Sequence, residues 1–69
     1  MNTVARVIEI SAVSDVSFED AVKVGVARAS KTLRNVTGAW IKEQRVDVAG
    51  GEVTSYQVNL MVTFVLEEE

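Results

Sequence analysis

The chain has 69 residues, with ten acidic and seven basic side chains and a formal net charge of −3, and it contains neither cysteine nor histidine. This composition excludes disulfides, thiolate zinc sites and catalysis by cysteine or histidine, although it leaves a carboxylate-only calcium or magnesium site open. Seven bases dispersed along an acidic chain also argue against a nucleic-acid-binding surface.

The first predicted element is a strand from Val4 to Ile10, where β-branched residues dominate. Ile8 and Ile10 project to one side and Val7 to the other, so neither face of this strand is cleanly polar. Residues 11–15 are polar, and we expect them to form a short connection.

The next predicted element is a helix that runs from Val16–Ser17 to Asn35. Ser17 and Asp20 have the spacing of a capping box, in which a hydroxyl and a carboxylate satisfy amide groups at the helix start. Apolar residues at steps of three and four form one stripe, which predicts the face toward the sheet; these are Phe18, Val22, Val26, Ala29 and Leu33.

The opposite side of this helix is unusually apolar for a solvated surface. At about 100° per residue, Asp20, Val24, Ala27 and Lys31 fall on the face away from the stripe. This face is either a tolerant surface or a contact with another subunit.

Two further strands are predicted, Gly38–Val48 and Val53–Leu66, joined by a hairpin turn at residues 49–52 whose paired glycines supply positive φ angles. The last strand is the longest and most apolar, so we expect it to be central. One set of its residues belongs beneath the helix, namely Tyr56, Val58, Leu60, Val62, Phe64 and Leu66. The acidic residues 67–69 are expected to form a solvated tail.

These elements predict an α+β fold in which a three-stranded antiparallel sheet packs on one helix in the order β-α-β-β. The helix leaves the other sheet face uncovered, and that face is not fully polar. By alternation it should carry Trp40, Met61 and Val65 beside Gln57, Asn59, Lys42 and Gln44. An apolar patch with a polar rim indicates an interface or a ligand site.

The size of the chain also points to association. So short a domain buries only about 60% of its unfolded surface, and small domains without disulfides or metals commonly need a partner chain. We therefore expect one domain, residues 1–69, that self-associates. Without an evident signal peptide or membrane-length apolar run, we expect a cytoplasmic protein that has no membrane partner.

Several segments together resemble the dodecin family over about residues 4–66. They are residues 7–10 (Val-Ile-Glu-Ile), residues 27–35 (Ala-Arg-Ala-Ser-Lys-Thr-Leu-Arg-Asn), residues 56–58 (Tyr-Gln-Val) and Phe64. The resemblance implies a β-α-β-β protein that assembles into a hollow shell of twelve copies. It also implies a flavin store or buffer, and not an enzyme, that binds riboflavin, FMN or FAD as stacked pairs between subunits.

The resemblance implies roles for particular residues. Gln57 falls where dodecins bond the polar edge of the flavin ring, Glu43 where a carboxylate faces the ligand, and Arg45 near the ribityl or phosphate end. The stacking tryptophan of the family, however, falls on Gly38. Trp40 projects from the same strand face about 7 Å further along and is either a displaced stacking platform or a subunit contact.

Other readings of these residues stay open. A basic residue that flavin binders often carry falls on Val65, Gln57 could be an ordinary strand residue, and Glu43 and Arg45 could form a simple surface ion pair. We therefore expect a flavin-binding storage shell, with a flavin-free shell that binds calcium, another ion or another small molecule, or is purely structural, as the alternative. Catalysis is not expected, because no pair of carboxylates or other groups has a spacing that identifies a reaction.

Overall fold

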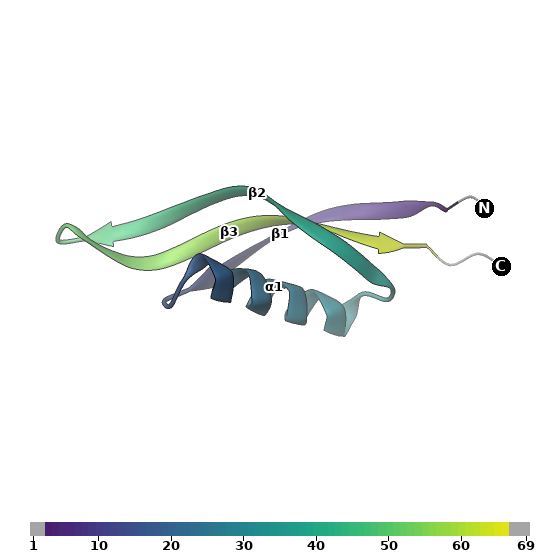
Figure 1. The fold of residues 1–69 in the computed structure, drawn as a ribbon, viewed down its shortest axis with the longest axis horizontal. Helices are drawn as coiled ribbons and strands as arrows, with labels where there is room; N and C mark the ends of the chain where they lie inside the picture. The colour runs from purple at the N-terminus through teal and green to yellow at the C-terminus, as the bar shows by residue number, and fades with distance from the viewer. Residues whose placement is uncertain (1–2, 67–69) are drawn as a thin grey trace.

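A computed structural model describes residues 3–66, so the predicted acidic tail at residues 67–69 lies outside the described part of the chain. The elements follow the predicted order (Figure 1), and they are β1 (Ala5–Ser14), α1 (Phe18–Thr32), β2 (Val36–Ala49) and β3 (Glu52–Val65). The α+β fold is therefore confirmed. Within residues 3–66, no helix is both long and apolar enough to cross a membrane.

The sheet has the strand order β1-β3-β2, with both pairs antiparallel, so the prediction that the last strand is central is confirmed. At the tip of the β2–β3 hairpin, Ala49 pairs with Glu52. Gly50 and Gly51 between them have φ angles of 61° and 81°, the conformation that a side chain at these positions would strain. The predicted turn is correct.

The predicted boundaries of the elements were less accurate. Residues 11–14 continue β1 and pair with Asn59 to Tyr56 of β3, so the expected polar connection is wrong over these four residues. The helix ends at Thr32 and not at Asn35. Leu33 already has extended backbone angles, and Asn35 turns the chain into β2 with a φ of 64°, which asparagine tolerates better than most residues.

The start of the helix is fixed by two serines. The Ser17 side chain caps α1, since its hydroxyl accepts from the Asp20 amide at 3.0 Å, as predicted. The Asp20 carboxylate does not complete the capping box; instead it accepts from the buried hydroxyl of Ser14 at 2.7 Å. Ser14 Oγ in turn accepts from the Val16 amide at 2.9 Å. The last residue of β1 therefore holds the beginning of the helix.

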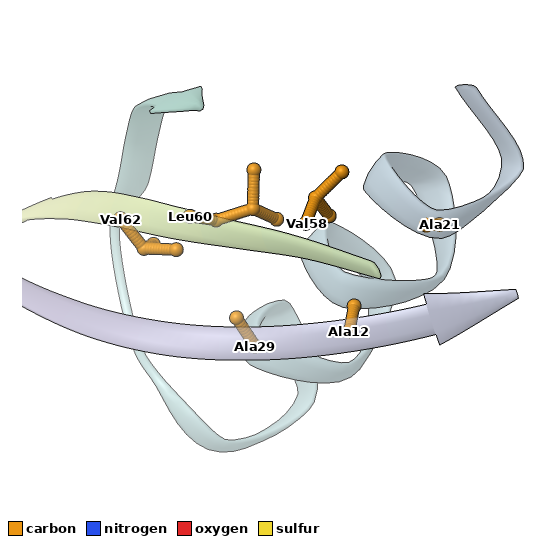
Figure 2. Close-up of a cluster of buried hydrophobic side chains, with 6 residues drawn as sticks. All are labelled: Ala12, Ala21, Ala29, Val58, Leu60 and Val62. Atoms are coloured by element: carbon orange, nitrogen blue, oxygen red, sulfur yellow. The ribbon is translucent and has the colours of Figure 1, made fainter. Parts of the chain in front are cut away.

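The core lies between α1 and the sheet (Figure 2). Its buried members are Val58, Leu60 and Val62 of β3, Ala12 of β1, and Ala21 and Ala29 of α1. The centre of the helix contact is Gly25, where an added Cβ would lie 2.9 Å from Leu60 Cδ1 and 3.1 Å from Ala12 Cβ. Ala21, Gly25 and Ala29, which are about one turn apart, thus let the helix approach the sheet closely. The larger residues of the predicted stripe pack beside them.

The position of Gly25 changes the interpretation of Val24. Val24 lies about 100° around the helix from Gly25, so it is on the flank of α1. The prediction that it lies directly opposite the sheet is therefore wrong. It is 49% exposed and lines an apolar groove of about 360 Å³ between α1 and β1, together with Ile8, Ile10 and Leu33. The apolar side of the helix therefore continues onto β1.

The β2–β3 hairpin extends well beyond the helix, which gives the molecule extents of 54 × 19 × 13 Å (Figure 1). Along β2 only Val36 and Val46 are even partly buried. The sheet face away from α1, here called the outer face, is therefore exposed to solvent along the hairpin.

Candidate functional site

The outer face is formed by alternate residues of β3 and their partners on both neighbouring strands. Gln57, Asn59, Met61 and Thr63 alternate with the buried residues Val58, Leu60 and Val62, so they project away from the helix. Their partners on β2 are Arg45, Glu43, Trp40 and Gly38, respectively. All five residues that the sequence singled out for ligand binding therefore lie on this one face.

A β-bulge in β2 makes this arrangement possible. Ile41 pairs with Leu60 and Glu43 with Asn59, so Lys42 is an extra residue between two successive pairs. Strict alternation would place Glu43 on the opposite face from Trp40, but the bulge returns it to the same face. It also makes one prediction wrong: Gln44 pairs with the buried Val58 and belongs to the helix side of the sheet.

Beside the bulge lies a polar hollow of about 290 Å³. Its lining residues are Glu43, Gln44, Arg45, Gln57 and Asn59. The structure thus brings together Gln57, Glu43 and Arg45, and it adds Asn59. Alternation predicts Asn59 beside Gln57, but no motif in the sequence assigns it to the site.

The side chains around the hollow are linked by hydrogen bonds. Gln57 Nε2 donates to Ser11 Oγ at 2.8 Å, Ser11 Oγ donates to Asn59 Oδ1 at 3.0 Å, and Asn59 Nδ2 donates to Glu43 Oε1 at 3.4 Å. An ionised carboxylate only accepts hydrogen bonds, so Glu43 determines which group donates and which accepts along this series of hydrogen bonds. Gln57 Oε1 accepts no hydrogen bond from residues 3–66 and remains available to a ligand N–H group. Ser11 is a residue of the site that the sequence does not indicate, because its polar segment is typical of a connection and not of a strand.

Arg45 is paired differently from the surface ion pair that the sequence suggested. Its Nη2 lies 2.9 Å from Asp47 Oδ1, while Glu43 bonds Asn59. The second Asp47 oxygen accepts from Ser55 Oγ at 2.7 Å. Arg45, the basic residue at the hollow, therefore already forms an ion pair with Asp47 of the same strand.

Trp40 and Gly38 lie further along β2, next to the hollow. The Trp40–Met61 pair is adjacent to the Glu43–Asn59 pair along the outer face, and Trp40 is 52% exposed. Gly38 is one pair further on, opposite Thr63. A Cβ at Gly38 would meet nothing within 4 Å, so the space beside the indole is open in the isolated chain. Lys42, on the bulge, reaches Glu9 of β1 at 3.4 Å.

The described residues show no group of three or more acidic side chains arranged to hold a metal ion. What they do show is a small β-α-β-β protein with a polar hollow beside an exposed indole on an open sheet face. Fold and site together define a small binding protein.

Comparison with known proteins identifies the family. The family model described as Dodecin matches residues 4–67, and the chain belongs to the dodecin family. A dodecin from Thermus thermophilus is 38% identical over 68 residues, which is 99% of each chain. A crystal structure of a Thermus thermophilus protein matches with a TM-score of 0.91 and 37% identity over 99% of this chain and 100% of that one.

A more distant match is a calcium dodecin from Mycobacterium tuberculosis, described as calcium-chelating. Its TM-score is 0.79 and its identity 30%, over 96% of this chain and 94% of that one. Membership of the family makes this chain a dodecin-like small-molecule-binding protein that self-assembles.

Proposed function

We propose that this protein binds a flavin between the subunits of a homododecamer and serves as a flavin store or buffer, without catalysing a reaction. The observation that carries the proposal is that the β2 bulge places Trp40, Glu43 and Arg45 on one face with Gln57. An indole beside a polar hollow suits a ligand that has a flat aromatic ring and a hydrogen-bonding edge.

The chemistry of a flavin matches these two parts. Its isoalloxazine ring would stack on Trp40, and the N–H of its imide edge would donate to Gln57 Oε1. The Ser11–Asn59–Glu43 chain would hold the Gln57 amide in that orientation. Since the hollow is open in one chain, a second subunit would supply its other wall.

Exposed apolar side chains support assembly. Large hydrophobic residues that are 42–60% exposed occur on every element, and they include Val7, Val13, Val24, Trp40, Ile41, Val48 and Val53. A monomer of this size rarely leaves so many apolar groups in water. We propose twelve copies, in keeping with the family.

The direct test uses purified, undialysed protein. We expect a particle mass of twelve chains by light scattering, a flavin absorbance band, and saturable quenching of added riboflavin fluorescence. A stable folded monomer at micromolar concentration would contradict the assembly. An intact oligomer that does not quench riboflavin at high micromolar concentration would contradict flavin binding.

The second outcome would favour a flavin-free shell that binds calcium or another small ligand. Gly38 at the family position of the stacking tryptophan supports this alternative, as does similarity to the calcium dodecin of Mycobacterium tuberculosis. Calorimetric titration of the metal-free oligomer with calcium would reveal such binding.

Replacing the hydrogen-bonding side chain should weaken flavin binding moderately. Gln57→Ala is expected to cost on the order of 1 kcal/mol, about fivefold in affinity, because water replaces part of one hydrogen bond. Fluorescence titration with riboflavin measures this change. Lys23→Ala, which truncates an exposed side chain of α1 outside the hollow, is the control and should leave the affinity unchanged; equal losses in the two variants would mean that Gln57 does not contact the ligand.

A charge at the helix flank should weaken assembly. Val24→Glu would bury a carboxylate if another subunit covers the groove between α1 and β1, and an unpaired buried charge costs several kcal/mol. We expect a shift toward smaller species in sedimentation velocity. Ala27→Glu places the same charge further around the helix and should have less effect. An unchanged mass for Val24→Glu would exclude this flank from the interface.

A further inference from the structure

We propose that Asp47 makes this site select electrically neutral planar ligands over phosphorylated ones. This inference rests on the proposed flavin binding and specifies which form of the ligand the site takes. No sequence signal had pointed to Asp47, because its role depends on the register of the hairpin.

The charges around the hollow carry the inference. Among its lining residues only Glu43 and Arg45 are charged. Arg45 is the group that an anionic ligand would need, but its guanidinium lies 2.9 Å from Asp47 Oδ1. Lys42, the next base along β2, is 3.4 Å from Glu9. Both bases are therefore engaged before a ligand arrives.

Asp47 is held in place as well as paired. It lies opposite Ser55, one pair beyond Arg45 and Gln57 on the same face. The Ser55 hydroxyl donates to Asp47 Oδ2 at 2.7 Å, so each carboxylate oxygen has a partner. This geometry fixes the carboxylate beside the guanidinium rather than leaving it free to turn away.

An incoming phosphate would therefore meet an unfavourable balance of charge. Glu43, Arg45 and Asp47 together carry one positive and two negative charges, and the phosphate would have to displace Asp47 from Arg45 while approaching Glu43. An uncharged ring with a hydroxylated side chain has no such cost. Its polar groups can use Gln57 and Asn59 without breaking the ion pair.

Solvent limits the size of the effect. The side chains of Arg45 and Asp47 are 66% and 48% exposed, so water and salt screen their fields. At about 5 Å in a water-like dielectric, removal of one charge beside a phosphate changes its affinity by about tenfold at most. Asp47 should thus bias the choice of ligand without excluding phosphorylated forms.

Riboflavin and FMN are suitable probes, because they share the ring and the ribityl chain and differ by one phosphate. Fluorescence titration of the assembled wild-type protein at low salt should show tighter binding of riboflavin than of FMN. Asp47→Asn keeps an acceptor for Ser55 but removes the charge. It should leave riboflavin affinity unchanged and raise FMN affinity by about five- to tenfold, and added salt should reduce this gain.

Two controls separate charge from structure. Glu19→Gln makes the same change of net charge on an exposed helix residue and should leave the riboflavin-to-FMN ratio unchanged. Ser55→Ala removes the support of Asp47 but not its charge, and it should change the ratio less than Asp47→Asn does. A ratio that moves equally in Glu19→Gln, or wild-type protein that prefers FMN, would overturn the inference while flavin binding stands. Binding of neither flavin would overturn the proposed function and this inference with it.

Discussion

Leu60→Ala is expected to lower the free energy of unfolding by about 2–5 kcal/mol, the range for leucine-to-alanine changes in protein cores. Leu60 is 1% exposed and occupies the middle of β3, where its Cδ1 lies against Gly25 of the helix. Neither Gly25 nor Ala12 has a side chain that could move into the vacated space. Much of the cavity should therefore persist, which places the cost toward the upper part of the range.

Urea denaturation followed by circular dichroism measures this loss. Unfolding of an oligomer is coupled to dissociation, so wild type and variant must be compared at one protein concentration. Leu66→Ala makes the same change at a residue that is 42% exposed and should cost much less. Equal losses at the two positions would mean that Leu60 is not the centre of the core.

The elements with strong local signals could be predicted from the sequence. Unbroken alternation along β3 gave its buried residues and its central place, and paired glycines gave the hairpin turn. The cap at Ser17 followed from side-chain chemistry alone. These features depend on residues close together in the chain, so a single sequence is enough to reveal them.

The features that failed depend on pairing between distant residues. Residues 11–14 are polar enough for a loop, and only their pairing with β3 makes them a strand. The bulge at Lys42 leaves no mark in the residue types, yet it decides which side chains share a face with Trp40. Gly25 does not stand out in the sequence, because a hydrophobic stripe consists of large residues, whereas close helix packing selects small ones.

The same long-range effects shaped the candidate site. The resemblance to dodecins drew attention to Gln57, Glu43 and Arg45, which the structure brings around one hollow. It did not reveal Ser11 or Asp47, which engage Gln57 and Arg45 respectively. Such partners alter what a binding residue offers to a ligand, because an engaged group must first be released.

Trp40→Ala is expected to remove most of the flavin affinity, about 1–3 kcal/mol or five- to 150-fold, as for other stacked aromatic platforms. The indole is 52% exposed, so the chain should fold without it, and circular dichroism should be unchanged. Ile41→Ala is a suitable control, since Ile41 is the neighbouring exposed residue of β2 but pairs with Leu60 of the core side. Riboflavin titration of both variants measures the difference.

Gly38→Trp tests whether Trp40 substitutes for the stacking tryptophan that the resemblance to flavin-binding dodecins implies at position 38. Gly38 does not have a positive φ, and a Cβ there would meet no atom within 4 Å, so one chain accepts the larger side chain. If Trp40 is the platform, the double change Gly38→Trp with Trp40→Ala should restore binding that Trp40→Ala alone removes. If wild type fails to bind flavin and Gly38→Trp gains binding, Trp40 is not a stacking platform and the proposed flavin binding is wrong. The natural protein would then be a flavin-free member of its family, with its fold and assembly intact.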